Sequence, residues 1–235
     1  GSMRALDFIE DEKRITRLAV VQGVVSKFID HRPNDRIGMV VFGEQAYTQC
    51  PLTLDQDILQ SFLSKLEIGM AGDSTAIGSA IGIAVKRLKD LESKSKVIIL
   101  LTDGRNNAGS LPPLQAAQTA KTFGIKIYTI GVGTKGKAPF LVNSIFGQRY
   151  VYQQVDIDEN TLKKIAQVTG GEYFRATDLE SLKNIYNQID EMEKSEVKVI
   201  DHSEYKELFY YFLVPGLMFI LLEIGLSNSL LRRIP

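Results

Sequence analysis

The chain has 235 residues, of which 44% are hydrophobic and 24% charged, enough apolar material for one globular domain with an appended segment. Its 28 basic and 28 acidic side chains cancel, and no basic stretch is interleaved with aromatic residues, so nothing in the composition favours nucleic-acid binding. The single cysteine, Cys50, cannot form an internal disulfide, and we expect it to be a small packed residue. The two histidines are far apart in sequence, which argues against the common kinds of zinc site.

Helical and strand patterns alternate along residues 1–195. Apolar residues recur at helical spacing over 18–29, and a continuous apolar run of strand length follows. The pattern repeats through the chain, with strands predicted at 37–42, 97–101 and 125–132 and helices at 18–29, 77–88, 113–124, 162–169 and 179–192. Short apolar strands between helices are typical of βαβ units, so the sequence predicts an α/β fold with a doubly wound (Rossmann-like), mostly parallel sheet.

The C-terminal stretch 208–226, LFYYFLVPGLMFILLEIGL, has a different character. Glu223 is its only charge, and its length just suffices to cross a hydrocarbon core of about 30 Å. Because the stretch is apolar all round and contains Pro215, we expect one C-terminal transmembrane helix in preference to a buried terminal helix. Glu223 either faces a partner helix or reaches the membrane interface.

The flanks of this span predict its orientation. Two arginines, Arg232 and Arg233, follow the span, which places the short basic tail 227–235 in the cytoplasm. The domain 1–195, joined through a juxtamembrane linker at 196–207, then lies on the opposite side, which in a bacterium is the periplasm.

Oxygen-bearing side chains follow one predicted strand and precede one predicted helix. Asp103 comes directly after the strand at 97–101, and Ser74 and Thr75 precede the helix that starts near Ile77. Ligands of an open α/β sheet bind beyond the carboxyl ends of its strands, and a site of hydroxyls and carboxylates prefers magnesium, manganese or calcium. Two simpler roles stay open: Ser74 or Thr75 could cap the helix, and Asp103 could hold its own turn.

Four segments, IILLTDGRNNAG, DSTAIGSAI, DRIGMVVFGEQAYTQCPLT and IYTIGVGT, closely resemble the von Willebrand factor type A (VWA) domain. The most similar subgroup is the BatA type of bacterial membrane proteins, named for Bacteroides aerotolerance, and the resemblance extends to the final LLRRIP. In this family the metal-ion-dependent adhesion site (MIDAS) reads D-x-S-x-S, then a threonine, then the aspartate of T-D-G. The resemblance implies that Ser2, Thr75 and Asp103 are ligands of Mg²⁺, or of Mn²⁺ or Ca²⁺.

The first three residues, Gly1-Ser2-Met3, allow two interpretations. They could remain from the removal of an affinity tag, or they could be the end of the D-x-S-G-S-M that is typical of BatA-type proteins. The stretch RALDF that follows them is similar to the family's own continuation and favours native residues. The first aspartate and first serine of the motif, and the strand that carries them, are then expected upstream of Gly1, so that the chain is truncated inside its metal site.

The resemblance implies a function in binding. Hydroxyl ligands add no charge, so the cation keeps an open position that a carboxylate of a partner protein can fill. We expect a module of the bacterial inner membrane for divalent-cation-dependent protein–protein interaction, with other Bat-type proteins and a MoxR-type AAA+ ATPase as partners in aerotolerance or stress resistance. The alternatives are an adhesin for an extracellular ligand and, least favoured, a metal-dependent hydrolase. We do not expect an enzyme, because the candidate loops hold no histidine that could act as a base.

Residues 131–136 match the pattern G-x-G-x-x-G after a predicted strand. A dinucleotide site needs a helix next, and the following stretch, which contains Pro139, Asn143 and Gly147, does not predict one. We expect a strand exit followed by an irregular loop.

Overall fold

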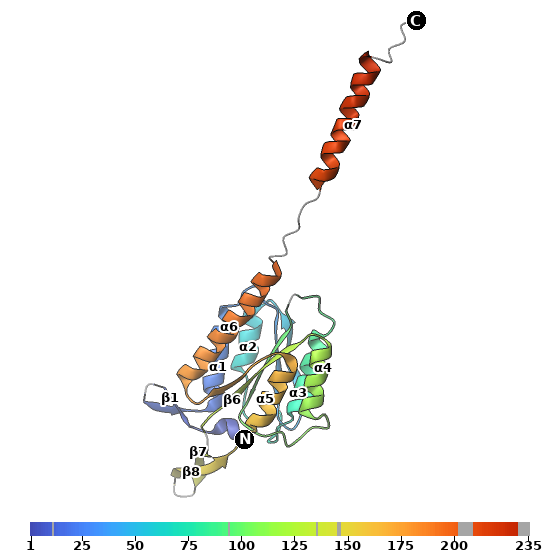
Figure 1. The fold of residues 1–235 in the computed structure, drawn as a ribbon. Helices are drawn as coiled ribbons and strands as arrows, with labels where there is room; N and C mark the ends of the chain where they lie inside the picture. The colour runs from blue at the N-terminus through green and yellow to red at the C-terminus, as the bar shows by residue number, and fades with distance from the viewer. Residues whose placement is uncertain (11, 94, 135, 145–146, 202–208, 230–235) are drawn as a thin grey trace. The chain divides into compact units, whose positions relative to one another are not determined.

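The computed structural model describes residues 1–10, 12–93, 95–134, 136–144, 147–201 and 209–229 (Figure 1). The chain forms two compact units, Gly1–Ser195 and Glu196–Pro235, called here unit 1 and unit 2. Three strands of unit 1 form a parallel sheet in the order β5-β6-β9, with bounds Val97–Thr102, Lys126–Val132 and Tyr173–Ala176. The predicted α/β fold with a parallel central sheet is therefore confirmed.

Each predicted helix of the domain is found close to its predicted position, and α2 is a further helix that the sequence analysis did not predict. The bounds of the helices are α1 Arg17–Asp30, α2 Gln56–Ser64, α3 Ile77–Leu88, α4 Pro113–Thr122, α5 Glu159–Thr169 and α6 Leu179–Asp201. Helix α5 ends at Gly170, whose φ of 76° is a left-handed conformation that favours glycine, as the sequence predicts. Helix α6 continues past the predicted end at 192 and into the stretch expected as a linker.

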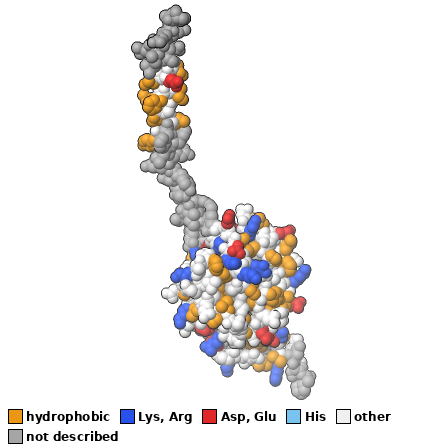
Figure 2. All heavy atoms as spheres, turned by 90° about the vertical axis from the view of Figure 1, so that its right-hand side faces the viewer, with side chains coloured by type: hydrophobic (Ala, Val, Ile, Leu, Met, Phe, Trp, Pro, Cys, Tyr) orange, Lys and Arg blue, Asp and Glu red, His pale blue; other side chains and the backbone are white. Residues whose placement is uncertain are grey.

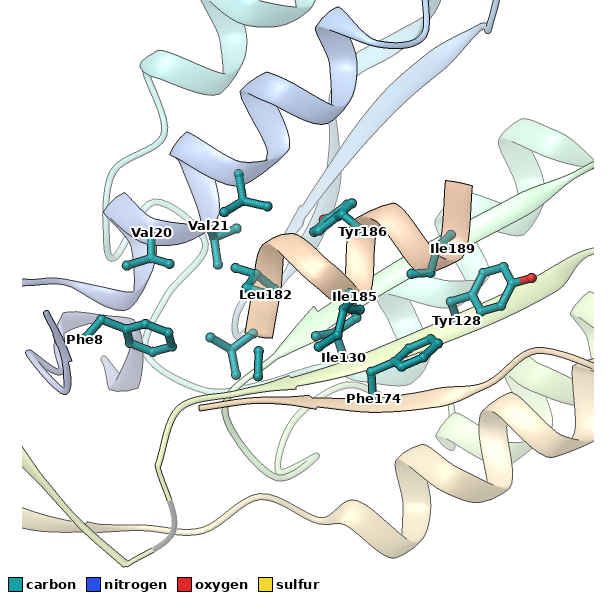
Figure 3. Packing of buried hydrophobic residues seen from close by; sticks show 13 residues of the cluster. Phe8, Val20, Val21, Tyr128, Ile130, Phe174, Leu182, Ile185, Tyr186 and Ile189 are labelled. Atoms are coloured by element: carbon teal, nitrogen blue, oxygen red, sulfur yellow. The ribbon is translucent and has the colours of Figure 1, made fainter. Parts of the chain in front are cut away.

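Strand β6 separates two apolar layers because alternate side chains point to opposite faces of a strand. Tyr128 and Ile130 pack with α1 and α6, on the face that Figure 3 shows, where Leu182 and Tyr186 of α6 lie over the sheet. Ile127 packs instead in the cluster that α3, α4 and α5 build on the other face. Helices thus cover both faces of the sheet, as a parallel sheet requires.

The other described strands pair antiparallel, and here the structure differs from the expected, mostly parallel sheet. These pairs are β1–β2 (Phe8–Glu10, Lys13–Ile15), β3–β4 (Ile37–Phe42, Ala46–Thr53) and β7–β8 (Gly136–Ser144, Gly147–Val155). Strand β3 joins β4 through a short turn in which Gly43 N donates to Gln45 O at 2.8 Å. So short a connection suits only an antiparallel pair, because parallel strands need a crossover of a dozen or more residues.

The hairpin β7–β8 occupies the stretch for which we expected an irregular loop. Its strands contain aromatic and β-branched residues, which are typical of strands. The sequence analysis missed this signal. Cys50, in β4, is a free thiol with 1% exposure, which confirms its expected packing role.

Helix α7 of unit 2 spans Phe209–Ser229 and contains Pro215. Its described apolar side chains are exposed, among them Met218 at 69% and Phe219 at 74%, and Figure 2 shows them along the helix. Within the part of the chain that the structure describes, no helix has both the length and the apolarity needed to cross a membrane. The span predicted at 208–226 lies partly outside the described residues and is not found in the structure. Most of the predicted tail 227–235 also lies outside them.

Candidate metal site

Asp103 and Thr75 lie at the same edge of the parallel sheet. Asp103 follows β5 directly and is 6% exposed. A Cβ atom added to the next residue, Gly104, would lie 3.2 Å from Thr75 Oγ1, so the two loops are in close contact. The backbone joins them as well, because Asn107 N donates to Thr75 O at 3.0 Å. The loop after β5 and the loop before α3 therefore lie together, as we expected from their positions at the end of a strand and the start of a helix.

Ser2 joins this edge from the other end of the sequence. It lies in a 3₁₀ turn, Ser2–Arg4, and its Oγ donates a hydrogen bond of 2.6 Å to Asp103 Oδ1. Gly1 N lies 3.4 Å from Asp73 Oδ1, so the same segment also reaches the loop before α3. The structure therefore brings the three predicted ligands, Ser2, Thr75 and Asp103, to one place.

Helix α3 takes its cap from the loop after β5 and not from the residues in front of it. Ile77 N donates to Asn106 Oδ1 at 2.8 Å, and Thr75 N donates to Asn107 Oδ1 at 2.7 Å. The residue at the cap position, Ala76, has no side chain able to accept a bond. The interpretation of Ser74 or Thr75 as a helix cap is therefore wrong.

Asp103 likewise does not hold its own turn. Gly104 N donates to Thr102 Oγ1 at 3.3 Å, while the carboxylate of Asp103 accepts bonds from Ser2 and Arg17. The side chain of Asp103 thus faces the site instead of stabilising its own loop. The two asparagines of the cap, Asn106 and Asn107, were missed by the sequence analysis. The signal available was two consecutive amides after T-D-G, at the binding edge of a sheet.

Arg17, at the start of α1, is the buried cation beside this edge. Its side chain is fully buried and binds Asp7 with three bonds: Nε donates to Oδ1 at 2.9 Å and to Oδ2 at 3.2 Å, and Nη2 donates to Oδ2 at 2.6 Å. Its Nη1 donates to Asp103 Oδ2 at 3.1 Å. Sequence analysis missed Arg17 and Asp7. Arg17 could have been noticed, because the first turn of a helix usually favours acidic and not basic side chains.

These contacts change the ionisation of both partners. Burial alone would raise the pKa of Asp7, but hydrogen bonds from Arg17 and from Thr134 outweigh it and hold the pKa below its usual range. Burial alone would lower the pKa of Arg17, but its bonds and charge interactions with Asp7 and Asp103 raise that pKa above the ordinary value. Asp7 and Arg17 are therefore both charged at neutral pH. Two buried carboxylates face one buried guanidinium, which leaves one negative charge in excess.

The G-x-G-x-x-G stretch at 131–136 supports this ion pair. Thr134 donates to Asp7 Oδ2 through its backbone N and its Oγ1, both at 3.0 Å. Gly133 has a φ of 110°, and a Cβ there would lie 2.3 Å from Arg17 Cζ. Strand β7 follows this stretch in place of a helix, so no helix N-terminus is presented to a pyrophosphate.

The donor set fits a hard divalent cation. The edge offers the hydroxyls of Ser2 and Thr75 and the carboxylate of Asp103, which are all oxygen donors, and the excess negative charge favours a cation. Across the described residues, no cluster of three or more His, Cys, Asp or Glu side chains is placed to hold a metal ion. A site here would consequently depend on hydroxyl groups, which is the composition that the sequence predicts.

An α/β fold with hydroxyl- and carboxylate-bearing loops at the carboxyl edge of its parallel strands is the arrangement of a VWA-type domain. The family model described as "von Willebrand factor type A domain" matches residues 9–188, and the chain belongs to this family. Two solved structures extend the likeness to Bat-type proteins. BatB from Bacteroides thetaiotaomicron is 30% identical, with a TM-score of 0.68 over 82% of this chain and 94% of that one. An aerotolerance-related membrane protein from Bacteroides fragilis is 29% identical, with a TM-score of 0.66 over 80% of this chain and 92% of that one.

Curated relatives are longer than this chain. An uncharacterized protein of Borreliella burgdorferi is 28% identical over 99% of the chain, which spans 67% of that relative. The chain spans only 56% of a UPF0353 protein of Mycolicibacterium gilvum that is 29% identical over 81% of the chain. The fold alone is shared with proximal thread matrix protein 1 of the mussel byssus. That protein, described with a zinc-occupied MIDAS motif, is 18% identical, with a TM-score of 0.54 over 73% of this chain and 41% of that one.

Proposed function

We propose that the chain is a divalent-cation-dependent protein-binding module. The observation that carries this proposal is that Ser2, Thr75 and Asp103 converge on one edge of the sheet. Asn106 caps helix α3 and Thr102 holds the turn after β5, so the side chains of Thr75 and Asp103 are not used for those two purposes. Ser2 and Thr75 would hold the cation through neutral hydroxyls, and Asp103 through its carboxylate. Mg²⁺ is the expected ion, with Mn²⁺ or Ca²⁺ as substitutes.

The charge of the site favours binding over catalysis. Neutral hydroxyl ligands leave most of the cation's charge uncompensated, so a carboxylate of a partner protein is a suitable further ligand. Hydrolysis would need a general base beside the cation, and neither histidine, His31 or His202, is on these loops. The mussel protein, which shares only the fold, is described with zinc in its MIDAS motif, so a protein with this fold can hold a divalent cation.

The Bat-type likeness supports a role at the bacterial inner membrane, with unit 1 in the periplasm. The relative from Bacteroides fragilis is described as a membrane protein related to aerotolerance. The apolar segment 208–226, whose described side chains are exposed, would attach the chain to the membrane. Other Bat-type proteins and a MoxR-type AAA+ ATPase are the proposed partners, in aerotolerance or stress resistance.

The test compares the unaltered chain with Asp103→Asn as bait for candidate Bat-type partners, each with Mg²⁺ and with a chelator. We expect capture that requires both Mg²⁺ and Asp103. Capture that is equal in all four conditions would contradict cation dependence. The same preparations are assayed with generic ester substrates, and turnover that requires Mg²⁺ and Asp103 would favour the hydrolase instead.

A further inference from the structure

Arg17 is held mainly by Asp7. Asp7 receives three bonds from the guanidinium, the shortest at 2.6 Å, whereas Asp103 receives one at 3.1 Å. Thr134 fixes Asp7 from the opposite side with two further bonds, and the backbone of Gly133 packs against the guanidinium. The guanidinium therefore has a fixed position that Asp103 does not determine.

This fixed charge lies directly beside the proposed cation. Asp103 uses Oδ2 for Arg17 and Oδ1 for Ser2, so a cation held by Asp103 lies within a few ångströms of a guanidinium that is 0% exposed. Charges that are separated by so little and shielded from water repel strongly, because the effective dielectric constant there is far below that of water. The repulsion opposes cation binding but leaves Asp103 in place.

From this geometry we infer that Arg17 is a positioning residue that limits the affinity of the site for a free divalent cation, so that tight binding requires a further carboxylate. The inference rests on the proposed function, which already gives the partner a carboxylate, and adds Arg17 as the residue that makes this carboxylate necessary. The partner contributes an aspartate or glutamate, whose negative charge offsets that of Arg17 at the cation. The site thereby binds cation and partner together, and neither tightly alone.

The test uses the full chain and Mn²⁺ alone, with the free Mn²⁺ measured by electron paramagnetic resonance. The variant Arg17→Gln/Asp7→Asn removes the guanidinium together with the carboxylate that holds it, so no unpaired charge is left between the two. We expect it to bind Mn²⁺ about tenfold more tightly, or better, than the unaltered chain. A purely structural role of Arg17 predicts the opposite, because the loss of its bond would disorder Asp103.

A second variant should change the Mn²⁺ affinity in the opposite direction. Asp7→Asn keeps the guanidinium and removes its main counter-charge, so Mn²⁺ affinity should fall about tenfold. The matched control is Lys89→Gln/Asp90→Asn, which removes an exposed ion pair of 3.7 Å and should leave the affinity unchanged. If the Arg17 and Asp7 double variant does not fold, as judged by circular dichroism and thermal unfolding, the Asp7→Asn result decides.

The outcomes separate this inference from the proposed function. Equal or weaker Mn²⁺ binding by the folded double variant, or unchanged binding by Asp7→Asn, would overturn the role of Arg17 and leave the metal site standing. Binding that is measurable in the unaltered chain but indifferent to Asp103→Asn would overturn the metal site. Where the unaltered chain shows no measurable binding, a gain by the double variant would support the limit set by Arg17, and no gain would overturn both.

Discussion

Ser2 Oγ donates a hydrogen bond of 2.6 Å to Asp103 Oδ1 across 101 residues of sequence. The bond places the first turn of the chain on the loop that follows β5, at the carboxyl edge of the parallel sheet. Asp103 is thereby shared between a neutral hydroxyl and the charged guanidinium of Arg17. This sharing is the basis of the first prediction.

Asp103→Asn should lower the affinity for Mg²⁺ or Mn²⁺ at least about tenfold while the domain stays folded. Arg17 keeps its bonds to Asp7, so the free energy of unfolding should fall by only about 1–3 kcal/mol. Calorimetric titration and urea unfolding measure the two effects. The control is Asp90→Asn, a carboxylate with 83% side-chain exposure. Undiminished cation affinity in Asp103→Asn would refute the site.

Asn106→Ala should destabilise the start of α3. Asn106 Oδ1 accepts from Ile77 N at 2.8 Å, and the loss of a helix cap typically costs about 1 kcal/mol. Chemical denaturation measures the change, and the exposed Asn34→Ala serves as control. Equal stabilities of the two variants would mean that the cap does not contribute.

Gly133→Ala should be far more costly than an ordinary glycine substitution. The new Cβ would lie 2.3 Å from Arg17 Cζ at a φ of 110°, so the variant must either displace a buried ion pair or strain the backbone. We expect a loss of about 3 kcal/mol or more, against about 1 kcal/mol for Gly170→Ala, whose φ is also positive but whose Cβ would meet nothing within 4 Å. Thermal unfolding of both variants decides, and equal losses would show that the contact with Arg17 is unimportant.

The sequence predicted those features that local pattern determines. Apolar runs such as 97–101 and the helical spacing over 77–88 are properties of neighbouring residues, and they locate β5 and α3. Once those elements are placed, the rule that ligands bind beyond strand ends brings Asp103 and Thr75 together. Ser2 was placed by family resemblance alone.

The surroundings of the buried ion pair could not be predicted from the sequence, because Thr134 and Asp103 reach it only through tertiary packing. Asp7 meets Thr134 across 127 residues, and nothing near either residue indicates the other. Strand β7, and not a helix, follows the glycine pattern at 131–136. Gly133 of this pattern leaves space for the side chain of Arg17, and this role depends on how α1 packs against the sheet.

Deleting residues 208–235 should release the chain from membranes, if the proposed attachment through this segment is right. The segment is the one long apolar stretch of the sequence with a single charge, Glu223. Carbonate extraction of membranes from cells expressing the full or the shortened chain distinguishes the two cases. A shortened chain that still resists extraction would disprove attachment through this segment.

A second buried carboxylate, Glu193 of α6, should make stability depend on pH away from the metal site. Glu193 is 5% exposed and accepts bonds from Tyr128 OH at 2.7 Å, Ser95 Oγ at 2.7 Å and Lys126 Nζ at 3.2 Å. Burial alone would raise its pKa, but these three donors outweigh it and hold the pKa below the ordinary value of 4.5. The carboxylate is therefore stabilised in its charged form by the folded chain.

The sign of the pH effect follows from this lowered pKa. A group whose pKa falls on folding contributes stability that is fully present above its unfolded pKa and is lost as pH falls through its folded pKa. Glu193→Gln should therefore cost about 1–3 kcal/mol at pH 7, and the difference from the unaltered chain should shrink as pH falls below about 4.5. Urea unfolding at pH 7, 5 and 3 measures it, with the exposed Glu92→Gln as control. A difference that is constant from pH 7 to 3 would show that the charge of Glu193 contributes nothing, and that only its packing holds α6 to the sheet.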